Sequence, residues 1–157
     1  MSREALTVLA AIGSGVTGGV YFAFSDFVMR ALRRLPPRQG MAAMQQINGA
    51  APSPLFMTAL FGTAAICIAL AVLATADRAE PGAKHQIAGS GLYLTTVILT
   101  AAYHVPRNSA LAGTDPQAAA AVRVWASYAS RWTLWNHARS IGAIAAAATF
   151  AVGLTRS

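Results

Sequence analysis

The sequence WASYASRWTLWNHAR, from Trp125 to Arg139, leads directly into an apolar run that extends from Ile141 to Leu154. This stretch holds all three tryptophans and contains neither Pro nor Gly, so nothing in it interrupts a helix. With about 100° between successive residues, one stripe of that helix carries Trp125, Tyr128, Trp132, Trp135 and Arg139. Asn136 falls in the same sector, whereas His137 points about 100° away from its centre. Two interpretations follow: a binding site at the mouth of an apolar helix, or an aromatic belt with an interfacial arginine.

The composition is that of a membrane protein. The chain has 157 residues, of which 55% are hydrophobic and only 11% charged, and its mean hydropathy is +0.48. Soluble domains carry about 25% charged residues. The net charge of +7 is spread through the connectors, which argues against a nucleic-acid partner and favours contact with the anionic headgroups of a lipid bilayer. The single cysteine, Cys67, lies in an apolar run, which excludes a disulfide framework and a thiolate metal cluster.

Four apolar stretches are long enough to cross a bilayer, at approximately residues 5–26, 55–76, 87–105 and 132–154. They predict a single all-α domain, an integral membrane four-helix bundle. The last helix is expected to start at Gln117 and to run for about 55 Å, so that it partly protrudes from the membrane. The stretch from Arg107 to Pro116 is expected to be a loop, because Pro106 precedes it. A signal peptide is the alternative for the first stretch, but no cleavage motif precedes Ser25.

Four spans would place both termini on one side of the membrane and the unusual polar residues on the other side, at a polar mouth of the bundle. Eight of the twelve basic residues fall there: Arg30, Arg33, Arg34, Arg38, Arg107, Arg123, Arg131 and Arg139. The positive-inside bias then puts this mouth in the cytoplasm. The expected location is therefore multi-pass, in a bacterial inner membrane.

Four local strings support a family resemblance: FSDFVMRALRRLPP (Phe24–Pro37), MQQIN (Met44–Asn48), VPRNSAL (Val105–Leu111) and WASYASRWTLWNHAR. Their order and spacing resemble the DUF1772 family of small four-helix membrane proteins, which includes the anthrone oxygenases. The family pattern W-x-x-W-N-H-x-R is matched by Trp132, Trp135, Asn136, His137 and Arg139. Its Asn after the Pro of the third span is matched by Asn108, and its Q-x-I-N by Gln45 and Asn48. The chain departs from the pattern at Arg107, where Leu is frequent, and at His104.

This resemblance implies an anthrone oxygenase-like membrane protein that oxidises a planar aromatic substrate of the polyketide type, a reaction that is sometimes run without a cofactor. Such a site needs a base, donors for an enolate oxygen and a flat apolar slot. The expected catalytic residues are His137, Asn136 and Arg139. The expected substrate-binding residues are Trp132, Trp135, Asn108, Asn48, Tyr103, His104 and Asp26. His137 and Arg139 point about 160° apart on an ideal helix, so His137 is expected to act next to a neighbouring helix, near His104 or Asn108.

Other chemistry has less support in the sequence. Two histidines with Asp26 could form a facial iron triad, but none of the usual metal-ligand spacings occurs, and no metal or other cofactor is expected. There is no phosphate-binding loop and no nucleophile elbow. The alternative function is non-enzymatic: a carrier of a small hydrophobic molecule, or a partner subunit that packs through Gly15 and Gly19. The sequence leaves two separate questions open: whether the protein is an enzyme, and whether it forms a homo-oligomer.

Overall fold

The computed structural model describes residues 1–156, and the regular structure of that part of the chain is entirely helical. Five continuous helices follow one another. They are α1 (Arg3–Ala23) continued by η1 (Phe24–Val28) and α2 (Met29–Arg34); α3 (Pro37–Ala50); α4 (Pro54–Met57) continued by η2 (Thr58–Gly62) and α5 (Thr63–Ala76); α6 (Ala83–Leu99) continued by η3 (Thr100–His104) and α7 (Val105–Ala112); and α8 (Ala121–Leu154). The segments η1, η2 and η3 are single π-helical turns, which are wider than the α-helix that they interrupt.

Local sequence signals fix where several helices begin. Ser53 caps α4, because its hydroxyl accepts a hydrogen bond from Phe56 N at 3.3 Å. Pro37 and Pro54 occupy first-turn positions, where the N–H that proline lacks has no partner inside the helix. The turn before α6 requires Gly82, whose φ of 82° lies in the left-handed region.

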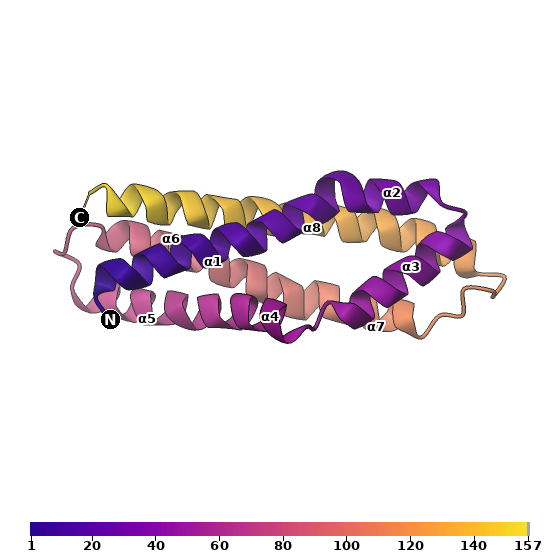
Figure 1. Cartoon of the computed structure of the whole chain (residues 1–157), viewed down its shortest axis with the longest axis horizontal. Helices are drawn as coiled ribbons and strands as arrows, with labels where there is room; N and C mark the ends of the chain where they lie inside the picture. The colour runs from indigo at the N-terminus through magenta and orange to yellow at the C-terminus, as the bar shows by residue number, and fades with distance from the viewer. Residues whose placement is uncertain (157) are drawn as a thin grey trace.

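The four long helices form a bundle (Figure 1). α1 and α6 both pack along α8, and α5 packs along α6 and α1. Both termini and the α5–α6 connection lie at one end, which we call the terminal end. The α2–α3 and α7–α8 connections lie at the opposite, connector end, where the short α3 crosses between α2 and α4. The predicted all-α fold with a long fourth bundle helix is confirmed, since α8 has 34 residues and a length of about 51 Å.

Two predicted boundaries are wrong. The expected loop after Pro106 is helical as far as Ala112. A proline clashes with the carbonyl four residues earlier in a regular helix, and the π-helical turn η3 relieves that clash by changing the hydrogen-bonding register just before Pro106. The last helix begins at Ala121 rather than at Gln117, because Gln117 N donates to Asp115 Oδ1 at 2.9 Å within a turn.

Three helices are long and apolar enough to cross a membrane: Arg3–Arg34, Pro54–Ala76 and Ala121–Leu154. Within the described residues, the helix made by α6, η3 and α7 is not among them. Its polar side chains face the bundle interior, where Gln86, Ser90, Tyr93, Thr96 and His104 are buried. Its mean hydropathy is therefore lowered by residues that a surrounding lipid would not meet.

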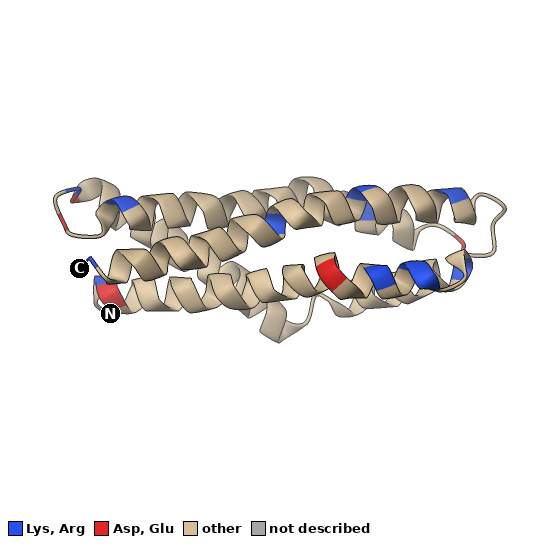
Figure 2. Cartoon of the chain, turned by 90° about the horizontal axis from the view of Figure 1, so that it is seen from above, with Lys and Arg blue, Asp and Glu red and all other residues tan. Residues whose placement is uncertain are grey.

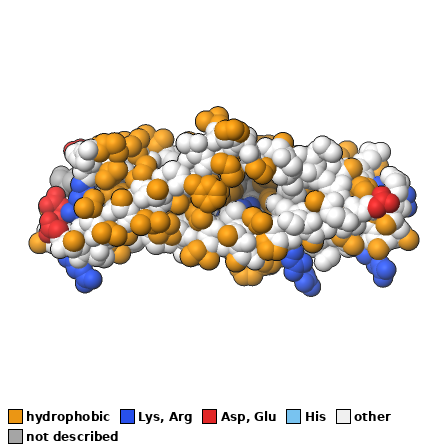
Figure 3. Space-filling view, turned by 90° about the horizontal axis from the view of Figure 1, so that it is seen from below, with side chains coloured by type: hydrophobic (Ala, Val, Ile, Leu, Met, Phe, Trp, Pro, Cys, Tyr) orange, Lys and Arg blue, Asp and Glu red, His pale blue; other side chains and the backbone are white. Residues whose placement is uncertain are grey.

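Charge divides the bundle along its length. Figure 2 shows acidic and basic residues at the terminal end and mainly basic residues over the connector half, with a nearly uncharged stretch between them. Hydrophobic side chains are spread over the surface of that stretch (Figure 3). This distribution is what a bundle partly embedded in a bilayer requires.

Two buried hydrophobic clusters stabilise the two halves. The connector cluster contains Met29, Leu32, Met41, Met44, Leu111, Ala121, Trp125, Tyr128, Ala129 and Trp132. The terminal cluster contains Ala10, Ala64, Cys67, Leu70, Tyr93, Ala146 and Phe150. Between them α1 and α8 approach closely at Gly18, where an added Cβ would lie 3.2 Å from the Ala143 side chain. The glycines that the sequence analysis singled out, Gly15 and Gly19, are exposed instead.

Candidate functional site

A cavity of about 250 Å³, which we call the inner cavity, lies inside the bundle beside α8. Its lining includes Met44 and Trp132 of the connector cluster and Val97, which packs on the terminal cluster. All three π-helical turns contribute to its wall, and such turns are frequent at functional sites. The polar lining residues are Asn48, Thr100, His104, Asn108, Asn136 and Arg139.

Arg139 places a guanidinium in the wall of this cavity with only 5% of the residue exposed. Its Nη1 donates to Thr100 Oγ1 at 3.1 Å. Its planar group lies over the rings of Tyr21, at 4.2 Å, and Trp132, at 5.5 Å. The Nε atom is buried without a hydrogen-bond partner. Among the described residues the one ion pair joins Arg30 to Asp26, so the buried charge of Arg139 has no carboxylate partner.

Asn136 fixes the direction of that guanidinium. Its Oδ1 accepts a hydrogen bond from Arg139 Nη2 at 2.5 Å. Its Nδ2 donates to the carbonyl oxygen of Tyr21 at 2.7 Å and to Ser25 Oγ at 2.8 Å. These contacts use both ends of the amide, and the residue is fully buried. Asn136 therefore orients Arg139 and ties α8 to α1.

A second hydrogen-bonded network forms the wall on the connector side. Asn108 Oδ1 accepts from Tyr128 Oη at 2.8 Å and from Trp132 Nε1 at 2.9 Å. The same Tyr128 hydroxyl accepts from Asn48 Nδ2 at 3.2 Å. The network joins α3, α7 and α8, so it also sets the position of the Trp132 ring.

His104 is the histidine of the inner cavity, and it is 1% exposed. Its Nδ1 lies 3.4 Å from the carbonyl oxygen of Leu99, which can only accept. In the neutral ring Nδ1 therefore carries the proton, and Nε2 keeps its lone pair. Nε2 is buried and has no hydrogen-bond partner. The ring meets Trp132 edge to face, with 5.1 Å between the ring centres.

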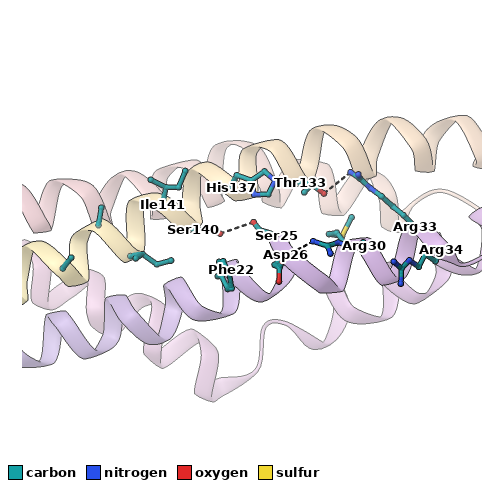
Figure 4. Close-up of a pocket in the computed structure, with 14 residues that line it drawn as sticks. Phe22, Ser25, Asp26, Arg30, Arg33, Arg34, Thr133, His137, Ser140 and Ile141 are labelled. Carbon is teal, nitrogen blue, oxygen red and sulfur yellow. Dashed lines mark hydrogen bonds and ion pairs between the residues drawn. The ribbon is translucent and has the colours of Figure 1, made fainter.

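The structure separates His137 and Asp26 from these residues. His137 is exposed and lines a second depression, the outer groove, which lies between α8 and the α1–η1–α2 helix (Figure 4). Asp26 lines the same groove, where its Oδ1 accepts from Arg30 Nη2 at 2.8 Å. The expected approach of His137 to His104 or Asn108 is not seen, because its rotation of about 100° from Asn136 puts it on another face of α8, toward the outer groove.

Trp135 and Tyr103 form an aromatic pair away from the inner cavity. Their ring centres lie 5.1 Å apart, and Arg107 lies over the Tyr103 ring at 5.3 Å. Trp135 is 43% exposed, so it does not share the buried face of Trp132. This pair has the character of the interfacial aromatic belt that the sequence analysis left as an alternative.

Sequence reasoning did not assign Tyr21 or Thr100 to the site. Tyr21 stood out only as one member of an aromatic cluster at the end of the first span. Thr100 has no motif around it, and its role follows from the packing of η3 against Arg139. Among the described residues there is no group of three or more His, Cys, Asp or Glu side chains that could hold a metal ion.

These features define a helical bundle with apolar spans and a buried, cationic, aromatic cavity. The family model described as anthrone oxygenase matches residues 55–149, which is more than half of the chain. The chain therefore belongs to the anthrone oxygenase family, as the local motifs predicted. The matched part includes Asn108 and the whole W-x-x-W-N-H-x-R motif, whereas α1 and α3 lie outside it. No curated protein and no solved structure gives a significant match.

Proposed function

We propose that this protein is a multi-pass oxygenase of a bacterial inner membrane, and that the inner cavity holds a planar aromatic substrate of the anthrone type. The observation that carries the proposal is the buried Arg139 guanidinium without a carboxylate. A buried charge is costly unless something compensates it. An enolate or phenolate oxygen of the substrate would do so, and the guanidinium would be oriented in advance for the charge that develops during reaction.

The reaction starts with the loss of a proton from the substrate methylene carbon next to the aromatic rings. The resulting enolate, with its oxygen at Arg139, passes electrons to dioxygen, and a carbon–oxygen bond forms. The peroxide takes back the proton held by the base, and loss of water, which uses the second hydrogen of the same carbon, leaves a carbonyl at the former methylene. One oxygen atom of dioxygen thus enters the product and the other leaves as water. The base needs a free lone pair inside the cavity, and His104 Nε2 meets that need.

This assignment changes the role that the sequence suggested for His137. We propose that His104 takes the proton, that Arg139 binds the enolate oxygen and that Asn136 positions Arg139. Trp132 provides one apolar face for the substrate. Asn48 and Asn108 close the connector side of the cavity through Tyr128. Asp26, His137, Trp135 and Tyr103 lie outside the inner cavity and have no direct part in this step.

The substrate would enter from the bilayer. Phe61 and Val105 line the inner cavity and are also exposed on the apolar surface of the bundle, at 58% and 53%. A flat, poorly soluble molecule could pass between η2 and η3, which carry residues next to this opening. The volume of about 250 Å³ lies just below the range typical of drug-sized ligands, which suits a compact fused-ring molecule.

The test is oxygen uptake with an anthrone by the protein reconstituted in liposomes, comparing His104→Ala with His137→Ala. Removing a general base lowers the rate by about 10²–10⁴, and this loss is expected for His104→Ala only. His137→Ala is expected to stay within about threefold of wild type, well short of that loss. The reverse result would reassign the base to His137. Absence of uptake by the wild-type protein would reject the oxygenase.

The absorption spectrum of the purified protein tests the expectation that the reaction needs no cofactor. In the proposed reaction the substrate supplies the electrons, dioxygen accepts them, and side chains of the protein supply the base and the hydrogen-bond donors. A bound flavin, haem or coloured metal centre would require a different source for the electrons. Such a spectrum would replace this part of the proposal.

A non-enzymatic role remains the second candidate, because the same cavity would also bind an aromatic anion without turnover. Stoichiometric binding of an anthrone without oxygen uptake would favour a carrier. A role as partner subunit or homo-oligomer is supported by the open face of α1, where nothing lies within 4 Å of a Cβ added at Gly19. Gly15→Leu or Gly19→Leu would then abolish assembly, whereas Arg139→Met would not.

A further inference from the structure

The outer groove lies where the charged half of the bundle meets the apolar half. Its volume is about 1040 Å³, and it runs between the α1–η1–α2 helix and α8. One end carries Arg30, Arg33 and Arg34 (Figure 4). The other end is lined by Phe22, Ile141, Ile144, Ala145 and Ala148. The groove is therefore amphipathic along its length.

The basic end keeps a positive charge that the chain does not balance. Arg30 pairs with Asp26, which is the one carboxylate in the groove lining. Arg33 donates to the carbonyl oxygen of Ala129 and to Thr133 Oγ1, so it holds α2 against α8 without being neutralised. Arg34 has no hydrogen-bond or ion-pair partner among the described residues. Three guanidinium groups thus meet a single carboxylate, which is complementary to an anionic ligand.

From His137 to Ala148 the groove has about the length of a single lipid leaflet. His137 and Ala148 both line the groove and are separated by about 16 Å along α8 at 1.5 Å per residue. The hydrocarbon core of a bilayer is about 30 Å thick, so one leaflet accounts for about 15 Å. Ala145 and Ala148 are small, and next to the exposed Ile141 and Ile144 they leave a furrow in the helix surface.

We propose that the outer groove binds an anionic glycerophospholipid. Its phosphate lies between Arg30 and Arg34, and one acyl chain lies along Ile141, Ile144 and Ala148. A charged headgroup and a chain of leaflet length satisfy the two ends of the groove together, which neither a soluble anion nor a neutral lipid does. The site is independent of the proposed oxygenase reaction, because the two arginines lie outside the inner cavity.

The experiment counts bound lipid by native mass spectrometry of the full chain in mild detergent. Phosphatidylglycerol is compared with phosphatidylcholine that carries the same acyl chains. The test variant is Arg30→Gln/Arg34→Gln, and the matched control is Arg123→Gln/Arg131→Gln, which removes two exposed arginines of α8 outside the groove. Each basic residue near a membrane surface attracts anionic lipid. The loss of two such residues is expected to weaken the binding of an anionic lipid by about thirtyfold. That loss is expected for the test variant and not for the control.

A second variant, Ala145→Trp, fills the apolar end and leaves the arginines in place. It is expected to weaken phosphatidylglycerol binding by at least about tenfold, since the acyl chain loses its furrow. Equal binding of the two lipids, equal loss in both arginine pairs, or glycerol 3-phosphate binding as tightly as phosphatidylglycerol would overturn the proposal. So would a dimer that Ala145→Trp dissociates without loss of lipid, because the groove would then hold a second copy of the chain.

Discussion

The inner cavity and the outer groove share a wall but differ in almost every physical property. The wall is a chain of hydrogen bonds: Asn136 Nδ2 donates to Ser25 Oγ at 2.8 Å, and the hydroxyls of Ser25 and Ser140 lie 3.1 Å apart. On one side Arg139 is buried without a carboxylate, and on the other side Arg30 is exposed beside one. The environment of an arginine, rather than its presence, therefore decides what it can do.

The same contrast applies to the two histidines. His104 is enclosed by Leu99 and Trp132, and its Nε2 has no partner. His137 is exposed in a groove that opens to the outside. Water and lipid headgroups can partner His137 from outside, whereas Nε2 of His104 is open only to molecules inside the inner cavity. Burial therefore supports chemistry in the inner cavity and recognition of membrane lipid in the outer groove.

Arg139→Met would test the contrast most strongly. Removing one preorganised donor to a developing oxyanion lowers the rate by about 10²–10³, and oxygen uptake with an anthrone is expected to fall by that factor. The thermal midpoint in detergent is expected to fall by only a few degrees, because the loss of the donor to buried Asn136 Oδ1 is offset by removal of a buried charge without a carboxylate partner.

Arg131→Met is the matched control, since Arg131 is an exposed arginine on the same helix. Its oxygen uptake is expected to equal that of wild type. Equal losses in the two variants would show that net charge matters rather than the position of the guanidinium. Full activity of Arg139→Met would remove the oxyanion role altogether.

A comparison of Gly13→Ala with Gly19→Ala extends the contrast to the two faces of α1. A Cβ at Gly13 would lie 1.9 Å from Thr63 Oγ1, so Thr63 must rotate or the α1–α5 contact must open. Overpacking of this kind costs about 2 kcal/mol, and the thermal midpoint of Gly13→Ala is expected to fall by several degrees. Gly19→Ala meets nothing within 4 Å and is expected to be neutral or slightly stabilising. Equal midpoints would mean that α1 does not approach α5 this closely in the membrane.

Sequence patterns predict the bundle because helix length and hydropathy are local properties. The apolar runs and the prolines between them place all four long helices, and the 100° periodicity puts Trp132, Asn136 and Arg139 on one buried face of α8. The same periodicity directs His137 away from that face. Its assignment as the base came from the family motif, which records that neighbouring residues occur together and not which way they point.

Contacts between helices could not be predicted in the same way. Thr100 and Tyr21 reach Arg139 from two other helices, and their placement depends on the rotation of each helix about its own axis. The π-helical turns η1 and η3 change that rotation by inserting extra backbone into a turn. No residue pattern in FSDFV or TAAYH distinguishes these turns from an ordinary helix.

Trp132→Phe and Trp135→Phe compare a buried with an exposed tryptophan on the same helix. Trp132 Nε1 donates to Asn108 Oδ1 at 2.9 Å, and its loss leaves the half-buried Asn108 amide with one donor fewer. The expected cost for Trp132→Phe is about 1.5 kcal/mol, seen as a lower thermal midpoint. Trp135 has no such bond in the described part of the chain, and Trp135→Phe is expected to keep the wild-type midpoint. A larger effect at Trp135 would show that the aromatic pair with Tyr103 is structural.

Asp26→Asn should have the smallest effect on stability and is the most direct test of where the boundary between the two regions lies. Asp26 and Arg30 form an exposed pair four residues apart, with side chains that are 48% and 64% exposed. Water screens such a pair, so its loss costs at most about 0.5 kcal/mol.

Because Asp26 lies outside the inner cavity, oxygen uptake of Asp26→Asn is expected to stay within about twofold of wild type. Phosphatidylglycerol binding should instead become about fivefold tighter, since the groove loses its one carboxylate and keeps its three guanidinium groups. A tenfold loss of oxygen uptake would place Asp26 in the reaction and join the outer groove to the catalytic site, because a change that alters neither packing nor the inner cavity has no other route to the substrate.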